Sequence, residues 1–196
     1  MNRSSFRHVA VAIGTTLVSL TATLPAHAHH ATGRPPETML EGLLSGVAHP
    51  LIGADHLLFL LLLGGLVARA GTDERRRTAA MAAAGSVIGA VVHLFGINLP
   101  AVEPAVAVSI IGAGALIVMR RRPTPLSVIA VAAVFHGYAF AESAVGAPLS
   151  VFGAYLLGLT VTQVAIVLGV ARLDRVAGTD PIDTDPASLR PDRAAR

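Results

Sequence analysis

The chain has 196 residues, of which 53% are hydrophobic and 14% charged, with a formal net charge of +3. A soluble domain carries about 25% charged residues, so this composition excludes an ordinary soluble protein and predicts an all-α, polytopic membrane protein. All basic residues are arginine and no cysteine occurs, which excludes disulfides, thiolate zinc sites and iron–sulfur clusters. No basic stripe indicates nucleic acid, and no P-loop motif indicates a nucleotide.

The first 28 residues are predicted to be a secretory signal peptide. Two arginines precede an apolar run that ends in an A-x-A cleavage pattern. Cleavage would expose a periplasmic lead over residues 29–39. His29 and His30 at its start are either incidental or able to capture a metal ion together with the new terminal amine. The alternative is an uncleaved first helix.

Five membrane spans are expected in a domain of residues 40–171. The first is too long for one straight span of about 20 residues, and Pro50 and Gly53 predict a break or kink within it. A charged loop is expected at residues 69–78 and a disordered cytoplasmic tail at residues 172–196. The expected spans are residues 40–68, 79–97, 102–119, 126–143 and 149–171.

The arginines predict the orientation of these spans. If the mature N-terminus is periplasmic, the outer segments carry only Arg34, and every other arginine after residue 28 lies at the cytoplasmic face. The positive-inside rule therefore favours a multi-pass protein of the bacterial inner membrane. Small residues such as Gly85 and Gly89, and Gly153 with Gly158, predict close helix packing. The oligomeric state, a homo-oligomer included, stays open.

Two clusters of ionisable residues lie inside apolar runs. They are H-P-L-I-G-A-D-H at residues 49–56 and F-H-G-Y-A-F-A-E at residues 135–142. Ionisable groups inside a membrane segment are costly and tend to be kept where they handle an ion, a proton or a substrate. The candidate metal ligands are therefore His49, Asp55, His56, His136 and Glu142.

All five candidates fall between the midplane and the periplasmic surface of the expected spans, as a site open to the periplasm requires. His93 and Glu103 fall at similar depth and are further candidates. A core histidine would explain His93 equally well, and the helix dipole would explain a carboxylate at the start of a span. For the main candidates the alternative is hydrogen-bonded packing between helices.

The geometry of the first cluster depends on helix continuity. His49 and His56 lie two turns apart and share one face of a continuous helix, whereas a break would free backbone carbonyls to act as ligands. Asp55 would bind the metal in a kinked segment or orient another ligand. Histidine with carboxylate suits nickel, cobalt, zinc, copper(II) or iron(II), while magnesium and calcium prefer oxygen ligands alone.

These clusters resemble the signatures of the HupE/UreJ family of nickel and cobalt permeases. The first matches the family's H-x5-D-H motif, and the second is similar to its F-H-G-x-A motif with a following glutamate. The chain departs from the family in having Phe140 where many members have a second histidine, which implies lower affinity or altered metal preference. Some members place the glutamate one position later. Many members also have a sixth mature helix. In this sequence no apolar segment that could form it follows residue 171.

The resemblance implies a secondary permease or channel that imports Ni²⁺ or Co²⁺ and is driven by the ion gradient, the membrane potential or proton exchange. In this interpretation the chain is no enzyme and holds no resident cofactor, and its partners are a divalent transition-metal ion and the lipid bilayer. Two alternatives stay open, an intramembrane zinc hydrolase and a b-haem protein with two histidine ligands. The transported ion and the metalloenzyme pathway supplied are undecided.

Overall fold

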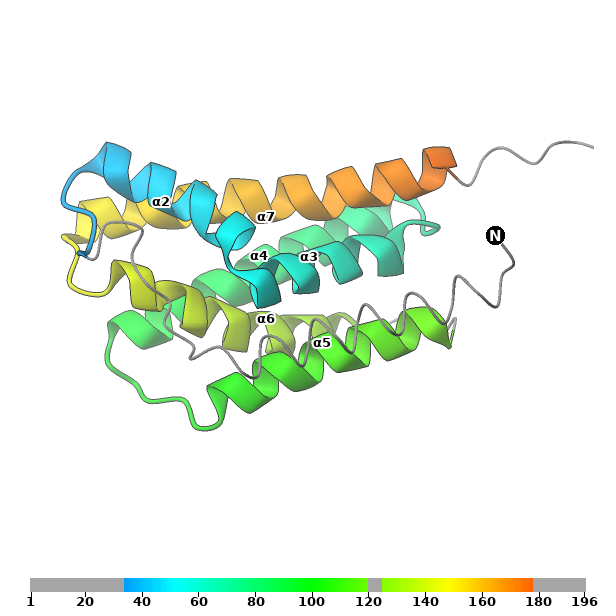
Figure 1. Ribbon diagram of the computed structural model, residues 1–196, viewed down its shortest axis with the longest axis horizontal. Coiled ribbons are helices and arrows are strands. Elements are labelled where there is room, and N and C mark those ends of the chain that lie inside the picture. The colour runs from blue at the N-terminus through cyan, green and yellow to red at the C-terminus, as the bar shows by residue number, and fades with distance from the viewer. Residues whose placement is uncertain (1–33, 120–124, 178–196) are drawn as a thin grey trace, which may run out of the picture.

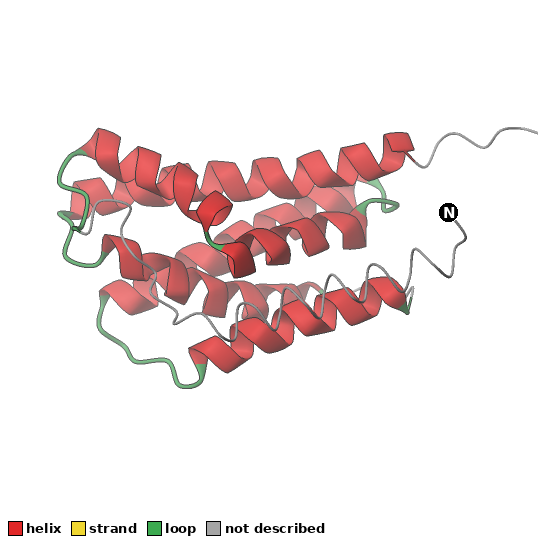
Figure 2. Ribbon diagram, viewed as in Figure 1, coloured by secondary structure: helices red, strands yellow, loops and turns green. Residues whose placement is uncertain are grey.

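The computed structural model describes residues 34–119 and 125–177, and this part of the chain is helical without strands (Figure 2). The predicted all-α membrane fold is confirmed. The proposed signal peptide, His29, His30, the arginines at 120–122 and the tail beyond residue 177 lie outside the described residues. The helices are α2 (Met39–Ile52), α3 (Ala54–Val67), α4 (Thr72–Leu94), α5 (Val102–Val118), α6 (Leu126–Ala141), η1 (Glu142–Ala144) and α7 (Leu149–Ala177).

Three helical segments are long and apolar enough to cross a membrane: α4, α6 together with η1, and α7 up to Leu173. The pair α2 and α3, bent by 75°, makes a fourth if it counts as one broken span. Helix α5 is apolar but has only 17 residues, or about 26 Å at 1.5 Å per residue, which is short for a hydrocarbon core of about 30 Å. The fifth span therefore stays a prediction.

The predicted break in the first span is present between α2 and α3. Pro50 lies in the last turn of α2, and Gly53 is extended, with φ −77° and ψ 104°. The Gly53 N–H donates to the carbonyl of His49 and ends the helix. Because the two helices diverge by 75°, the continuous-helix alternative, with both histidines on one face, is wrong.

Helix boundaries differ from the sequence expectation at the arginine-rich end. Helix α4 begins at Thr72, so the loop expected at 69–78 is shorter, and Asp73 and Glu74 lie in the first helical turn, where acidic residues offset the helix dipole. Arg75 is buried and donates from Nε and Nη2 to the Ala70 carbonyl. Helix α7 runs to Ala177, so the tail expected from residue 172 begins as helix.

Glycines bring two pairs of helices into close contact. A Cβ at Gly89 of α4 would overlap the Val134 carbonyl of α6, and a Cβ at Gly46 of α2 would overlap the Tyr155 carbonyl of α7. Gly158 likewise abuts α2, whereas Gly153 faces open space among the described residues. Figure 1 shows α2 running along α7, with α5 on the opposite side of the bundle. These two glycine-packed pairs set how closely α2, which carries His49, approaches α7, and how closely α6, which carries His136, approaches α4.

Candidate metal centre

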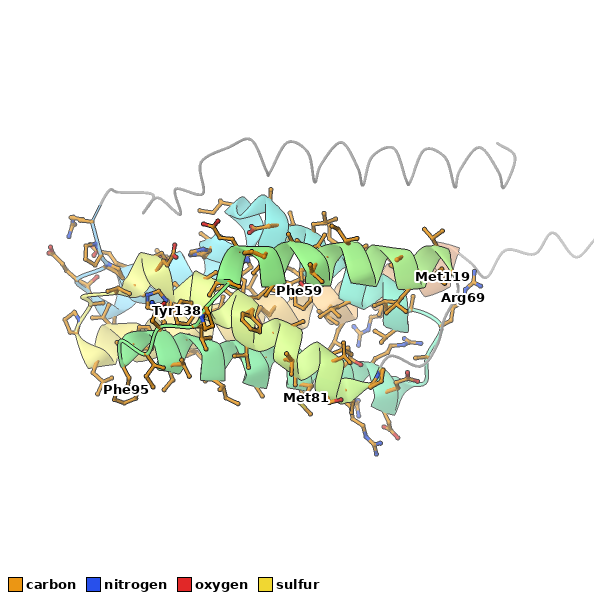
Figure 3. The ribbon with its side chains drawn as sticks, turned by 90° about the horizontal axis from the view of Figure 1, so that it is seen from below. Phe59, Arg69, Met81, Phe95, Met119 and Tyr138 are labelled. Atoms are coloured by element: carbon orange, nitrogen blue, oxygen red, sulfur yellow. The ribbon has the colours of Figure 1, made fainter. Side chains whose placement is uncertain are left out.

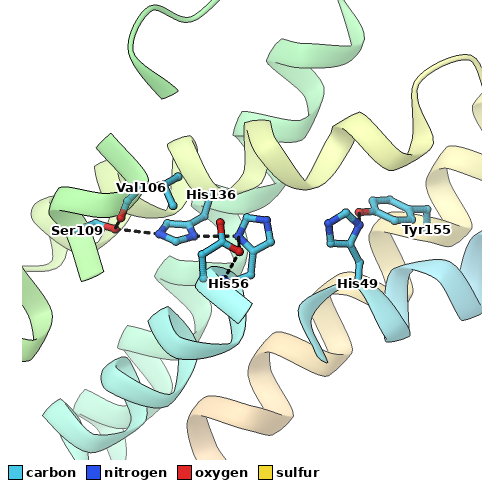
Figure 4. Close-up of polar contacts among 7 residues, drawn as sticks. His49, His56, Val106, Ser109, His136 and Tyr155 are labelled. Carbon is cyan, nitrogen blue, oxygen red and sulfur yellow. Dashed lines mark hydrogen bonds and ion pairs between the residues drawn. The ribbon is translucent and has the colours of Figure 1, made fainter. Parts of the chain in front are cut away.

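Three of the five main candidate ligands meet inside the bundle. His49 comes from α2, His56 from the first turn of α3 and His136 from α6, and their exposed fractions are 8%, 5% and 0%. The ring centroids of His49 and His56 lie 5.6 Å apart, and those of His56 and His136 lie 5.5 Å apart (Figure 4). The break after α2 and the packing of α6 thus gather three imidazoles from three helices in one row.

Hydrogen bonds at one end of this row determine ring tautomers. The Ser109 hydroxyl of α5 donates to the Val106 carbonyl at 2.7 Å, so its oxygen accepts from His136 Nε2–H at 2.9 Å. In a neutral His136 the other nitrogen, Nδ1, must then accept. It lies 3.2 Å from His56 Nδ1, which therefore donates. A neutral His56 consequently carries its lone pair on Nε2, which is the form that binds a metal ion.

His49 is oriented by a separate group of oxygens at the other end of the row. The Tyr155 hydroxyl donates to the Phe140 carbonyl at 2.6 Å, so its oxygen can only accept from His49 Nδ1 at 3.2 Å. The Ser143 hydroxyl oxygen lies 2.7 Å from the same nitrogen. With the proton on Nδ1, the His49 lone pair is also on Nε2. Oxygen acceptors behind the ring orient metal-binding histidines in the same way.

Aromatic side chains enclose the histidine row. Phe59 stacks on His136 with centroids 3.9 Å apart. The Phe140 ring lies 4.0 Å from His56 and 5.3 Å from His49. Phe140 stands where many members of the family that the sequence resembles carry a second histidine. Its ring therefore presents an apolar surface to two of the three imidazoles. An ion bound here would have only ring nitrogens and nearby oxygens to replace its water.

Asp55 lies beside the row without joining it. Its carboxylate accepts from the backbone N–H of His56 at 2.9 Å and lies 3.9 Å from His56 Nδ1. Its side chain is 40% exposed. The carboxylate therefore supplies negative charge next to His56 and remains accessible from outside the bundle.

The remaining candidates lie apart from the row. Glu142, in η1, is exposed and within electrostatic range of His93 and Glu103. His93 Nδ1 donates to the Tyr138 carbonyl at 2.8 Å, and its ring lies over Tyr138. We call Glu142, Glu103 and His93 the outer group. Across residues 34–119 and 125–177, no three His, Asp or Glu side chains are arranged ready to hold a metal ion.

Sequence reasoning missed the residues that orient the histidines, namely Ser109, Ser143, Tyr155 and Phe59. A signal existed for Ser109, because it and Glu103 are the only polar side chains in α5. No such signal marked the others, whose roles depend on contacts between residues far apart in the chain.

Comparison with known proteins supports the sequence resemblance along most of the chain. The profile of the family described as "HupE / UreJ protein" matches residues 16–181. The chain belongs to the HupE/UreJ family. Protein HupE of Rhizobium leguminosarum bv. viciae is 32% identical to it over 132 residues, which cover 64% of this chain and 64% of that relative. The match therefore spans just under two thirds of the relative's length. No solved structure matches this HupE/UreJ chain.

Proposed function

We propose that this chain is a permease that carries Ni²⁺, with Co²⁺ as the next candidate, into the cytoplasm across the bacterial inner membrane. The observation that carries the proposal is the row of three buried imidazoles from α2, α3 and α6 in a membrane protein of this family. Imidazole is a preferred ligand for borderline divalent ions. Nothing in the described residues or in the family match supports the intramembrane hydrolase that the sequence left open.

The path of the ion follows from the two sets of side chains. The outer group, with its two carboxylates, concentrates cations at the end of the bundle that carries few arginines. The ion then reaches His56 and His49, whose Nε2 lone pairs replace part of its water shell. Rings with centroids 5.6 Å apart need only modest rotation to bring one nitrogen of each to about 2 Å from a shared ion. The Asp55 carboxylate lowers the free-energy cost of holding the positive charge of the ion at this depth.

The absence of a ready three-ligand site among the described residues suits transport. An ion that crosses must bind well enough to enter and weakly enough to leave, and two neutral imidazoles near one carboxylate meet that requirement. A membrane potential of 100 mV favours inward movement by about 2.3 kcal/mol per elementary charge. Proton exchange at the histidines is the other available driving force.

Uptake of radiolabelled nickel tests the proposal. Cells that express the native chain should accumulate nickel above vector controls, with cobalt competing, and His56→Ala should reduce uptake to background. Leu61→Ala is the matched control, because Leu61 lies on the same helix but is 40% exposed at the bundle surface.

Membrane abundance of each variant, measured in the same cells, separates loss of transport from loss of protein. The proposal fails if the native chain, inserted normally, takes up no more nickel than the vector control. It also fails if His56→Ala transports as well as the native chain.

A further inference from the structure

Gln163 of α7 is a buried amide without a hydrogen-bond partner among the described residues. The side chain is 1% exposed, and neither its Oε1 nor its Nε2 has a partner within the described part of the chain. Most buried polar groups in native proteins are paired, and an exception calls for an explanation such as a bound water or ion. In a membrane-spanning helix the cost of an unpaired amide is greater, because lipid offers no replacement partner.

The position of Gln163 relates it to the histidine row. Tyr155, Leu159, Gln163 and Val167 follow each other at four-residue intervals on α7 and are all buried, so they form one inward-facing stripe. Tyr155 contacts His49, and the carbonyl of Val167 lies against Gly64 of α3. Gln163 therefore lies beyond the histidines towards the arginine-rich end, about 12 Å along the helix from Tyr155 at 1.5 Å per residue.

The part of the bundle beyond the histidines is largely apolar, although Thr162 of α7 and Thr78 and Arg75 of α4 are also buried there. Its core is built from α3 residues such as Leu60, Leu63 and Val67, packed with Val167 and Ala171 of α7. A divalent cation that leaves the histidines for the cytoplasm must pass this region, where an unsolvated charge is strongly disfavoured. A polar group at this depth is what the passage requires.

We propose that Gln163 is a second binding station for the partly hydrated divalent cation, next in line after the histidines. This inference rests on the permease function proposed above. The amide oxygen replaces one water of the ion, and the amide N–H₂ is a donor for an accompanying water. A neutral single-residue ligand holds the ion loosely, so the ion is passed on rather than trapped. The unpaired amide is thus kept for transport at the expense of stability.

The variant Gln163→Leu tests this inference because it removes the polar atoms and keeps a similar size. We expect nickel uptake to fall at least tenfold. Equilibrium nickel binding to the purified full chain in detergent should remain within threefold of native, because the histidines are intact. The thermal midpoint should stay equal or rise, since an unpaired buried amide has been removed. Val161→Ala, at an exposed position on the same helix, is the control.

Each other outcome overturns the inference. Native uptake by Gln163→Leu would show that the amide is not on the ion path. A lower thermal midpoint would show that the amide is structural, holding a buried water, and Gln163→Asn would then restore stability. If the native chain itself takes up no nickel, the permease proposal fails. If the native chain takes up nickel and Gln163→Leu takes it up equally well, only the second station is rejected and the permease proposal stands.

Discussion

At the scale of single residues, the tautomers of the histidine row depend on oxygen atoms that accept hydrogen bonds from the ring nitrogens at its two ends. Ser109 fixes the proton of His136 on Nε2, and His136 in turn fixes the proton of His56 on Nδ1. The oxygens of Ser143 and Tyr155 hold the proton of His49 on Nδ1. Both rings proposed to face the ion therefore present Nε2. His136, with both nitrogens engaged in hydrogen bonds, orients His56 in this arrangement, and would have to give up one of these bonds to bind the ion.

Replacing Ser109 tests this chain of hydrogen bonds. Ser109→Ala removes the acceptor of His136 Nε2–H, so that His136 no longer holds a single tautomer for His56. Loss of a group that orients a metal-binding histidine typically costs about 10- to 100-fold in metal affinity or activity. We expect a loss of that size in equilibrium nickel binding by titration calorimetry.

Ser109→Thr is the matched control, because it keeps the hydroxyl and should restore affinity to near the native value. A purely structural role for Ser109 would instead lower the thermal midpoint without changing affinity. Unchanged affinity in Ser109→Ala would contradict the assigned tautomers.

At the scale of elements, the site exists because one helix breaks and two pairs of helices pack closely. The break between α2 and α3 turns His56 towards α6, and a Cβ at Gly53 would lie 2.8 Å from the His56 ring. Close packing of α4 against α6 positions His136, since Gly137, next to it in the chain, lies against the backbone of Ser86. The same kind of glycine that allows close contact between helices in a membrane therefore fixes the position of α6, which carries His136, against α4.

Substitution of Gly89 tests the packing of α4 on α6. A methyl group at this position would overlap the Val134 carbonyl, and overpacking of this kind typically costs about 1–3 kcal/mol. We expect Gly89→Ala to lower the thermal midpoint measured in detergent.

Gly112→Ala provides the comparison, because a Cβ there meets no described atom within 4 Å. Since alanine is favoured over glycine in a helix by up to about 1 kcal/mol, this variant should be as stable as the native chain or more so. Equal stability of the two alanine variants would show that the α4–α6 contact is looser than the structure indicates.

At the scale of the whole molecule, the two ends of the bundle differ in charge and in chemistry. Arg69 and Met119 lie at one end, while Phe95 and Tyr138 lie towards the other (Figure 3). The described arginines at the first end include the buried Arg75, and the outer group and the histidines lie nearer the second. On the positive-inside rule we propose that the arginine-rich end faces the cytoplasm, and in that orientation the histidine row is reached from the periplasm.

Single cysteines test this orientation, since the chain has none of its own. Asn98 and Gly71 lie in exposed loops at opposite ends. We expect a membrane-impermeant maleimide to label Asn98→Cys in intact spheroplasts, and Gly71→Cys only after permeabilisation. The reverse pattern would place the histidines on the cytoplasmic side and contradict import through them.

Much of the architecture and part of the site were determined by the sequence itself. Hydropathy predicts helices in a membrane, Pro50 with Gly53 predicts the break, and the two histidine motifs indicate the family, because each is a property of neighbouring residues. Helix ends were less predictable. Acidic residues in its first turn let α4 begin at Thr72. The hydrophobic pattern could not predict this start, because it treats charged residues as part of a loop.

Only the tertiary structure decided which candidates lie side by side. His49, His56 and His136 meet, whereas Glu142 lies apart with His93 and Glu103. Helical spacing cannot predict this division, because it depends on how helices far apart in the chain pack against one another. The structure also decided which ring nitrogen carries each lone pair, since that follows from hydroxyl groups brought in by α5, η1 and α7. A sequence specifies which side chains are available to a metal ion, and packing between distant segments determines which of them can reach it together.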